Sequence, residues 1–509
     1  MTTAGDGVAP ALTPPQRRVL DLVREGHNVF FTGNAGTGKT FLVERIVEEL
    51  RTKYGGGFRR AVAVTATTGV AATHIGGQTL NSALGFGAVS RVRDFETMTT
   101  ANSRRRLREL RVLLIDECSM LSAEMLDEIE AKLREAREDP RPAGGLQLIL
   151  SGDFFQLPPV SRRPKDHEKD RTTGEVSPGV FLNRGFAFAS RAWERCAFRS
   201  VVLTHVHRQK DPTLVDALDI IRRGSDDDGR KARNALRRIV RACGRPLQRD
   251  DGIVPTMIFA RNKDVDDINE REMKRLVLEK GKKRVAMEGV DDVAPVDVVP
   301  EKGESMSVAR QRTADKLWKA DFFRDCLVWR KYELCVGAQV MLLRNLDTAE
   351  GRVNGSRGVV VDFVNADDVP LTSSVVCGYV DEEAARRWGG RPLPVVRFAD
   401  DGREHVIPPV RITHDVYGAG TCSRVQVPLK AAWAITVHKS QGMTLDAVAV
   451  SLCDMFAVGQ AYVALSRARS VEGLQILDWD LECLRTDGEV MGFYAAAARE
   501  AAEDEEDGV

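Results

Sequence analysis

The chain has 509 residues, 43% hydrophobic and 29% charged, which is an ordinary composition for a globular protein of two to four domains. No apolar stretch approaches the roughly 18 residues of a membrane-spanning helix, so no membrane partner is expected. The 74 basic and 74 acidic side chains balance, so a nucleic-acid partner would need a locally basic groove. Nine cysteines without a C-x-x-C pair favour reduced thiols over disulfides or a zinc site.

A first helix is predicted to begin in the segment LTPPQ at 12–16. Thr13 suits the N-cap and Pro14 suits the first helical position. Capping does not require the next polar residue, Gln16, whose carboxamide can both donate to and accept from an adenine edge. Gln16 therefore either completes the cap or contacts a base, and both interpretations stay open.

Short apolar runs then alternate with amphipathic segments through the first two hundred residues. The runs predict buried parallel strands at 28–32, 61–65, 112–115, 147–150 and 201–203. The segments 41–53 and 123–137 predict helices, and the basic run 103–111 predicts a solvated helix face. This alternation is typical of a doubly wound α/β sheet.

A glycine-rich segment, GNAGTGKT, follows the first predicted strand and precedes a helix. It fits the pattern G-x-x-x-x-G-K-[ST], in which backbone N–H groups surround phosphate oxygens at a helix N-terminus. Lys39 would neutralise the outer phosphates, and the Thr40 hydroxyl would bind Mg²⁺. The predicted nucleotide-binding loop comprises Gly33, Asn34, Ala35, Gly36, Thr37, Gly38, Lys39 and Thr40.

Two later strands also end in polar residues. The strand at 112–115 runs into Asp116, which suits the Mg²⁺ shell, and Glu117, which suits a base that polarises the attacking water. The segment LILSGDFFQLPPV places Gln156 after another strand, where it can hydrogen-bond a γ-phosphate or the water. These residues predict phosphoryl-transfer chemistry at one edge of the sheet.

Residues 161–210 carry weaker signals. The polar, turn-rich segment 161–179 predicts a mobile loop. His205 and His207 have no companions at metal-ligand spacing, so packing or hydrogen bonding is expected of them.

A second α/β unit is predicted to begin near Thr256 and to resume at Leu429. Short strands at 336–344, 358–363 and 394–398, with an Asn-Gly turn in 353–358, predict an inserted β-barrel. Residues 281–307 predict irregular structure, and the acidic end 499–509 predicts disorder.

The segment AAWAIT at 431–436 predicts a buried strand, and HKSQG follows at 438–442. A turn needs only a glycine and one small polar residue, so four packed polar side chains indicate a loop that binds something. The expectation is that this loop touches the nucleotide and a second ligand together.

The motifs GNAGTGKT, VTATTGVAATHIGGQTL, LLIDECSML, GDFFQLPPV, LTHVHRQ, VNGSRGVV, AWAITVHKSQGMTL and AYVALSRA occur in this order. Together the chain resembles the Pif-type DNA helicases of superfamily one, over residues 12–480. The resemblance implies an ATP- and Mg²⁺-dependent 5′-to-3′ DNA helicase with two RecA-like P-loop domains. The implied organisation is a tail at 1–11, a first domain at 12–210 with a small wedge insertion near 76–100, a second domain at 211–335 and 429–490, an SH3-like β-barrel at 336–428 and an acidic tail at 491–509.

The resemblance also implies roles for single residues. It assigns Gln16 to adenine, and Gln156, Arg208 and Arg467 to the γ-phosphate. Gln441 and Gly442 would approach the nucleotide. The implied DNA-facing residues are Thr65, Thr67, Thr68, Asn81, Asn262, Lys263, His438, Lys439 and Ser440, where Thr67 or Thr68 could instead cap a helix, and Asn81 replaces a histidine common in the family.

Single-stranded and tailed duplex DNA are the expected partners, with RNA–DNA hybrids or G-quadruplexes as further substrates. The resemblance places the protein in DNA repair, recombination or telomere maintenance, in the nucleus or mitochondrion, as a monomer or a weakly self-associating protein on DNA. Three alternatives stay open: a nucleotide-gated scaffold subunit, a Helitron-like transposon helicase and a RecD-type recombination helicase.

Overall fold

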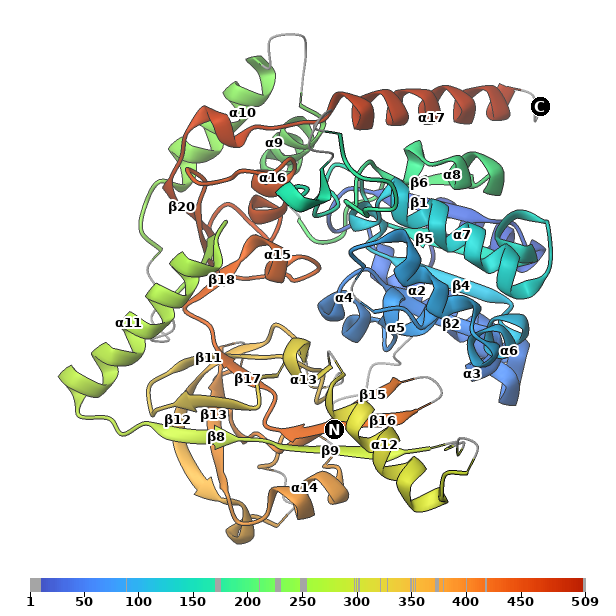
Figure 1. The fold of residues 1–509 in the computed structure, drawn as a ribbon. Coiled ribbons are helices and arrows are strands. Elements are labelled where there is room, and N and C mark those ends of the chain that lie inside the picture. The colour runs from blue at the N-terminus through green and yellow to red at the C-terminus, as the bar shows by residue number, and fades with distance from the viewer. Residues whose placement is uncertain are drawn as a thin grey trace, which may run out of the picture.

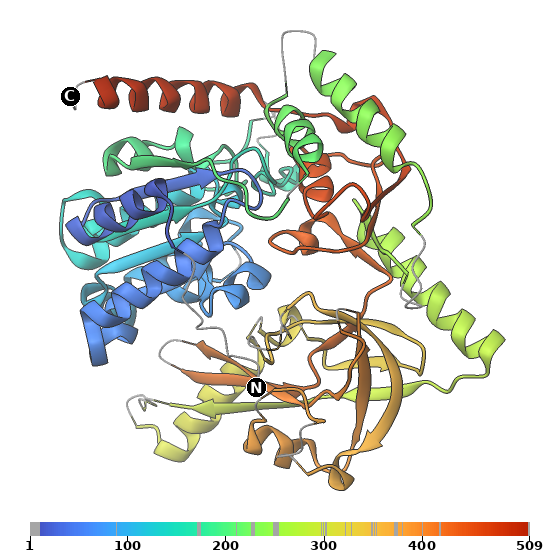
Figure 2. The same cartoon turned by 180° about the vertical axis from the view of Figure 1, so that it is seen from behind.

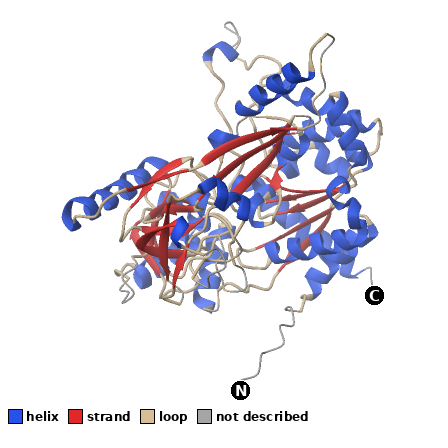
Figure 3. Cartoon of the chain, turned by 90° about the horizontal axis from the view of Figure 1, so that it is seen from below, coloured by secondary structure: helices blue, strands red, loops and turns tan. Residues whose placement is uncertain are grey.

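The computed structural model describes residues 11–506, apart from gaps at 88, 170–174, 210, 225–229, 248–253, 297, 299, 301–302, 321, 327, 348–349, 351, 353, 371–374, 379, 400 and 417–418. The predicted N-terminal tail therefore lies almost entirely outside the described residues. Three parts are distinct in Figure 1: two α/β parts and a β-rich part opposite them. Figure 3 shows the same chain from below, with strands and helices in different colours.

The first α/β part is built on a six-stranded sheet of parallel pairs, in the order β3-β2-β4-β5-β1-β6. The predicted strands are confirmed with small shifts of their ends. Their bounds are Val29–Gly33 (β1), Val62–Ala66 (β2), Gln78–Thr79 (β3), Val112–Asp116 (β4), Gln147–Ser151 (β5) and Arg199–Leu203 (β6).

Helices cover both faces of this sheet because its strands are apolar on both sides. Phe31 packs with α1 and α2 on one face, whereas Phe30 packs with α7 and α8 on the other. The sheet is thus doubly wound, as predicted. The helices are Pro14–Glu25 (α1), Lys39–Tyr54 (α2), Phe58–Ala61 (α3), Gly69–His74 (α4), Leu80–Leu84 (α5), Ala101–Glu109 (α6), Ala123–Arg137 (α7) and Arg191–Cys196 (α8).

The second α/β part contains a four-stranded parallel sheet in the order β18-β7-β19-β20. Its apolar strands pack with two helices that precede them, α9 and α10, and with α16. The strands are Thr256–Phe259 (β7), Ala434–Thr436 (β18), Val448–Ser451 (β19) and Leu474–Asp478 (β20). The helices are Pro212–Arg223 (α9), Arg230–Cys243 (α10), Asn262–Lys280 (α11), Val437–Ser440 (α15) and Gln460–Leu465 (α16).

The β-rich part has a five-stranded sheet in the order β14-β13-β12-β11-β17, with a three-stranded sheet β15-β16-β9 and the pair β10-β8. The strands are Val285–Glu288 (β8), Val290–Pro295 (β9), Lys331–Leu334 (β10), Gln339–Leu342 (β11), Arg357–Asn365 (β12), Pro392–Phe398 (β13), Glu404–Val406 (β14), Val410–Val416 (β15), Gly420–Gln426 (β16) and Leu429–Ala431 (β17). The helices are Met306–Trp318 (α12), Phe322–Asp325 (α13) and Glu382–Trp388 (α14).

Two expectations for this region are wrong. Residues 281–307 are not irregular, because β8 and β9 lie there and pair with β10 and β16, strands that are distant in sequence. β17 pairs with β11, so the chain returns to the second parallel sheet at β18 and not at Leu429. Domain boundaries drawn from sequence alone remain predictions.

The acidic end of the chain is also not disordered as expected, since a long helix, α17 (Gly488–Glu506), reaches almost to the terminus. It leaves the second α/β part and lies across the first, a path visible in Figures 1 and 2. Val490 is fully buried there, and Phe493 stacks on Phe188 with ring centroids 4.4 Å apart. An aromatic anchor therefore fixes the helix to the first sheet.

The segment 161–179 is more ordered than predicted over its described residues. Arg162 forms a bidentate ion pair with Glu168, at 2.6 and 3.0 Å, and the backbones of Lys169 and Val176 form an isolated antiparallel β-bridge. Part of the predicted mobile loop, 170–174, lies outside the described residues. None of the helices in the described part of the chain is long and apolar enough to cross a membrane.

Candidate nucleotide cleft and flanking polar loops

The phosphate loop lies between β1 and α2, where the sequence places it. Gly36 and Gly38 have φ of +86° and +81°, in the region that only glycine adopts without strain. A Cβ on Gly36 would lie 2.5 Å from the Cβ of Arg208, so the loop also needs glycine for this close approach. The loop conformation follows directly from its glycine spacing.

Lys39, the first residue of α2, is oriented back along the loop. Its Nζ donates to the carbonyl oxygens of Gly33 at 2.7 Å and Asn34 at 3.1 Å. Burial lowers the pKa of Lys39, and the carboxylates of Asp153 and Glu117 oppose that shift. The Lys39 ammonium therefore lies against the first residues of the loop, near the carboxylates of Asp153 and Glu117.

Asp116 and Glu117 terminate β4 beside this lysine. Burial raises the pKa of Asp116. Burial, and then the neighbouring Asp116, raise the pKa of Glu117 to about 7. Glu117 also has φ of +53°, an uncommon value for a residue with a side chain, and such outliers concentrate at functional sites. The turn presents the Glu117 carboxylate away from the strand direction.

The second α/β part reaches this acid directly. Gln441 donates its Nε2–H to Oε2 of Glu117 at 2.9 Å, across 324 positions of sequence. Gly459 approaches on the same side: a Cβ there would lie 2.4 Å from the carbonyl oxygen of Gln156. The two α/β parts therefore meet at Glu117 and Gln156, and this meeting place is called the nucleotide cleft below.

Arg467 and Arg208, predicted to face the γ-phosphate, are both at this cleft. Arg467 is 1% exposed, and burial together with the nearby Arg208 lowers its pKa to about 9. Its guanidinium donates to the carbonyl oxygens of Val463 at 2.7 Å and Met443 at 3.1 Å. Arg208 donates to the carbonyl oxygens of Ser466 and Gly442. Both arginines are thus held among second-part carbonyls, and the Glu117 carboxylate interacts with their charges.

Two further glutamines, Gln16 and Gln156, lie near the phosphate loop and make different contacts. Gln16 accepts from the Thr13 backbone N–H at 2.9 Å, so the capping alternative is observed, while its Nε2 lies 3.0 Å from the Cβ position of Gly38. The oxygen of the Gln16 carboxamide is used by the cap, so the amide nitrogen Nε2 is the group that could contact adenine. Gln156 is 3% exposed and its Nε2 donates to Asp153 at 3.4 Å.

The donor set beside the phosphate loop fits Mg²⁺. The Asp116 carboxylate and the exposed Thr40 hydroxyl offer oxygen ligands, and the buried Ser151 hydroxyl lies beside Asp116 and partly opposes the rise that burial causes in its pKa. Mg²⁺ prefers a few protein oxygens combined with phosphates and water. The residues present are therefore those that a phosphate-bound Mg²⁺ requires.

Sequence reasoning missed a buried ion pair next to Lys39. Asp153 follows β5 and is fully buried, and Arg222 of α9 donates to both of its oxygens at 2.7 and 2.9 Å. Burial opposes ionisation, but the guanidinium holds the pKa of Asp153 below its ordinary value. Asp153 stood in the GDFFQ motif and could have been found, whereas nothing singled out Arg222 on an amphipathic helix.

Two tyrosines were missed as well. Tyr462 of α16 accepts from the Ala35 backbone N–H of the phosphate loop at 2.7 Å. Tyr494 of α17 lies 2.7 Å from Thr32 Oγ1 and accepts from the Phe154 N–H at 3.1 Å. Parts of the chain more than 400 residues away thus contact the start of the loop.

The segment after β2 presents a polar turn at the same sheet edge. Thr68 Oγ1 accepts from the Ala71 N–H, so Thr68 caps α4, one of the open alternatives. Thr67 donates to the backbone carbonyl oxygen of Glu117 at 2.8 Å, so this turn is bonded directly to Glu117. The prediction that Thr65 faces DNA is wrong. Thr65 is fully buried and its hydroxyl donates to the carbonyl oxygen of Leu114 inside the sheet, so it cannot reach DNA.

The HKSQG turn divides its side chains between two directions. Gln441 faces Glu117, while Lys439 is exposed and His438 is half-buried, with its pKa lowered by burial. The prediction that Ser440 faces DNA is also wrong, because Ser440 is fully buried and its hydroxyl donates to the Val437 carbonyl oxygen. Lys430, which the sequence did not indicate, is half-buried near Lys439, and burial followed by that neighbour lowers its pKa to about 8.

The remaining predicted DNA contacts lie at related positions. Asn262 and Lys263 are exposed at the start of α11, directly after β7, which pairs in parallel with β18. They therefore share a sheet edge with the HKSQG turn. Asn81 donates to the Gly87 carbonyl oxygen from α5 of the first part.

His205 and His207 form an edge-to-face ring pair at 4.4 Å. The part of the chain that the structure describes contains no cluster of three or more His, Cys, Asp or Glu side chains suited to a metal ion.

Comparison with known proteins gives consistent relatives. A family model described as PIF1-like helicase matches residues 11–218, and one described as the 2B domain of DNA helicase Pif1 matches residues 324–363. The chain is 38% identical over 495 residues to the ATP-dependent DNA helicase PIF1 of Danio rerio, covering 97% of this chain and 65% of that protein. It thus spans about 65% of the length of its first curated relatives.

Two solved structures are similar over nearly the full chain. The Pif1 helicase from Candida albicans has a TM-score of 0.69 and 34% identity, covering 96% of this chain and 99% of that one. A Bacteroides Pif1 in complex with ADP-AlF3 and ssDNA has a TM-score of 0.60 and 27% identity, covering 96% and 98%.

Proposed function

The chain belongs to the PIF1-like helicase family, and from that premise we propose that it is an ATP-dependent DNA helicase moving 5′ to 3′ on single-stranded DNA. The observation that carries the proposal is the convergence of three side chains on Glu117 and the phosphate loop of the first part. Gln441 and Arg467 come from the second part, and Arg208 comes from the segment that joins β6 to α9. A motor needs hydrolysis to change the fit between two domains, and this cleft is built from both.

The first part holds and polarises the triphosphate. The loop N–H groups and Lys39 bind the phosphates, and Glu117 accepts a proton from the attacking water. Asp116 and Thr40 would hold Mg²⁺, and the bound ion would supply positive charge to the phosphate oxygens. Gln156 lies beside these groups and orients the water or the γ-phosphate.

Two arginines supply the positive charge that completes the site, Arg467 from the second part and Arg208 from the segment between β6 and α9. Arg208 and Arg467 stabilise the transition state when they reach the γ-phosphate, and loss of that phosphate releases them. Because Gln441 is bonded to Glu117 on the same short turn that carries Lys439, cleft closure moves the nucleotide contact and the DNA-facing lysine together. Hydrolysis is thereby coupled to the grip on the strand.

The DNA track runs over polar groups at the carboxyl edges of the two sheets. Thr67, Thr68 and Asn81 serve it from the first part, and His438, Lys439, Asn262 and Lys263 from the second. These groups recognise phosphates and not base edges, so binding is sequence-tolerant and salt-sensitive. The Bacteroides Pif1 in complex with ADP-AlF3 and ssDNA supports pairing a nucleotide site with a strand site in this fold.

The wider setting follows from the substrate. Tailed duplexes, RNA–DNA hybrids and G-quadruplexes are the structures that such a motor would resolve, as a monomer or a weak assembly on DNA. Its place would be in repair, recombination or telomere maintenance, in the nucleus or mitochondrion.

Unwinding of matched duplexes with either a 5′ or a 3′ single-stranded tail tests the proposal. With ATP and Mg²⁺, the 5′-tailed duplex is expected to be separated and the 3′-tailed duplex to stay intact, while the Lys39→Ala variant separates neither. Equal unwinding of both tails would overturn the direction, and unwinding by Lys39→Ala would overturn the mechanism.

A further inference from the structure

Helix α10 carries the most one-sided charge in the second α/β part. Its sequence, RKARNALRRIVRAC, contains six basic residues and no acidic residue. The buried positions Ala235, Leu236, Ile239 and Cys243 recur at helical spacing and pack into the second core. The basic residues are therefore displayed on the opposite, outward face.

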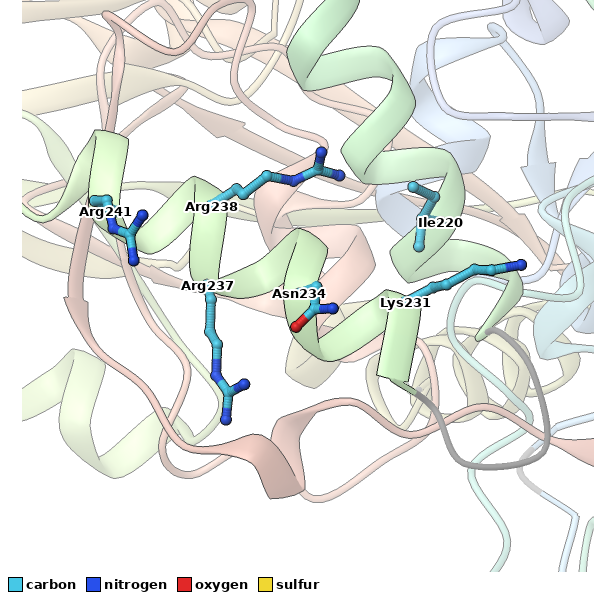
Figure 4. A pocket seen from close by; sticks show the side chains of 6 residues that line it. All are labelled: Ile220, Lys231, Asn234, Arg237, Arg238 and Arg241. Carbon is cyan, nitrogen blue, oxygen red and sulfur yellow. The ribbon is translucent and has the colours of Figure 1, made fainter.

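A shallow cavity of about 420 Å³ lies on this face. It is lined by Ile220 of α9 and by Lys231, Asn234, Arg237, Arg238 and Arg241 of α10. Figure 4 shows Arg237 and Arg238 leaving one turn of the helix in different directions and Arg241 leaving the next turn, with Lys231 farther toward the helix start. The lining side chains thus offer four positive charges, one amide and a single apolar contact.

The three arginines are free of ion pairs within the described part of the chain. Each is exposed, and among the described residues no carboxylate oxygen lies within 4.0 Å of any of them. Lys231 follows the acidic sequence DDD at 226–228 by three positions in the chain, and those aspartates lie outside the described residues. The argument therefore rests on Arg237, Arg238 and Arg241.

This surface is separate from the polar edge assigned to the DNA track. α10 packs against β20, which forms one edge of the second sheet, whereas the HKSQG turn follows β18 at the opposite edge. In Figures 1 and 2, α10 lies at the outer end of the molecule, away from the β-rich part. A strand in the cleft would leave this surface open.

We infer that the basic face of α10 is a second nucleic-acid surface, which binds the phosphate backbone of DNA outside the cleft. Guanidinium groups match phosphate oxygens with two parallel hydrogen bonds. From Arg237 to Arg241 the helix rises about 6 Å, close to two phosphate intervals of about 3.4 Å along the axis of a DNA duplex. The chain as a whole is neutral, so this charge is not a by-product of a basic protein.

An acidic protein partner fits the surface less well. Protein interfaces are centred on buried apolar or aromatic anchors, and among the described residues Ile220 is the sole apolar one that lines this cavity. Phosphate binding needs no such anchor. The inference rests on the proposed function only in taking DNA as the ligand.

The test is a triple charge reversal, Arg237→Glu with Arg238→Glu and Arg241→Glu. A matched control reverses three exposed cations of the first part, Lys53→Glu with Arg59→Glu and Arg60→Glu, which belong to no proposed site. Binding of a tailed duplex, and of a short strand that only crosses the cleft, is measured over a series of salt concentrations. Circular dichroism and the thermal midpoint establish that each variant is folded.

For the tailed duplex, the α10 variant is expected to lose about tenfold or more in affinity and to lower the salt slope by about 2 to 3, since each phosphate contact contributes about 0.9. The control variant and the short strand should show wild-type slopes. Replacing the same arginines by lysine should keep the slope, because the charge is retained.

An unchanged slope for the tailed duplex in a folded α10 variant would overturn the inference, even if an acidic peptide bound there instead. Failure of the proposed function would look different. It would appear as an absence of DNA-stimulated ATP hydrolysis by the wild-type chain, whatever the slopes.

Discussion

The two walls of the nucleotide cleft differ in how the chain makes them. The first wall consists of short continuous motifs at the ends of parallel strands of one sheet, such as Lys39 after β1 and Asp116 on β4. The second wall joins Arg208, from the segment after β6, with Gln441 and Arg467, which lie more than 200 residues farther along the chain. One wall is set by local sequence and the other by tertiary packing.

This difference explains what each wall can do. Backbone N–H groups fixed by glycine spacing give a preorganised phosphate site within the first part, to which Tyr462 of the second part adds one contact, at Ala35. The arginines are instead bonded to carbonyl oxygens of the second part, at Ser466 for Arg208 and at Met443 for Arg467. We expect the first wall to hold the nucleotide in every state and the second to engage it only on closure.

The largest expected effect follows loss of the first wall's charge. Lys39→Ala should reduce ATP hydrolysis to background, because no other cation of the loop can neutralise the outer phosphates. Steady-state hydrolysis with single-stranded DNA measures this, with Lys53→Ala, an exposed lysine of the same helix, as the matched control. Substantial hydrolysis by Lys39→Ala would remove the distinction between the walls.

Loss of the second wall's charge should separate catalysis from binding. Arg467→Ala is expected to lower kcat by about 10³-fold or more while nucleotide affinity changes little, since the arginine acts in the transition state. Arg469→Ala is the control, because Arg469 is 62% exposed and paired with Asp446. Weakened nucleotide binding with an unchanged kcat would mean that Arg467 holds the ground state.

The buried pair between the walls should act on stability. Arg222→Met leaves the Asp153 carboxylate buried without its partner, which is expected to lower the free energy of unfolding by about 3 to 5 kcal/mol. Arg223→Met is the neighbouring control, since Arg223 is 66% exposed. Urea unfolding followed by circular dichroism compares them, and equal midpoints would show that the pair is dispensable.

The smallest expected effects lie within the HKSQG turn. Ser440→Ala should leave DNA affinity nearly unchanged because its hydroxyl is buried and bonded to Val437. Lys439→Ala should weaken binding and lower the salt slope by about 1. Fluorescence anisotropy with a single-stranded oligonucleotide distinguishes the two, and a larger loss for Ser440→Ala would restore Ser440 to the DNA surface.

Sequence reasoning succeeded where a pattern is local. The doubly wound sheet, the phosphate loop and the acids after β4 all follow from apolar runs that end in fixed polar residues. It failed for Thr65 and Ser440 because composition does not reveal which way a hydroxyl faces at the end of a strand or in a short turn.

Long-range contacts were beyond its reach for a physical reason. Strands β8 and β9 have weak patterns and depend on pairing with β10 and β16. The acidic tail forms a helix because Phe493 and Tyr494 anchor it to a distant aromatic core. Neither Arg222 nor Tyr462 belongs to a motif that would indicate a partner on the other wall.

The central claim is that both walls act on one γ-phosphate, and a crystal structure with ADP, Mg²⁺, aluminium fluoride and single-stranded DNA tests it most directly. The account predicts that Arg208 and Arg467 leave their carbonyl partners and hydrogen-bond the same phosphate mimic as Lys39. Arginines still bonded to Ser466 and Met443, with the mimic contacted by the first wall alone, would contradict it.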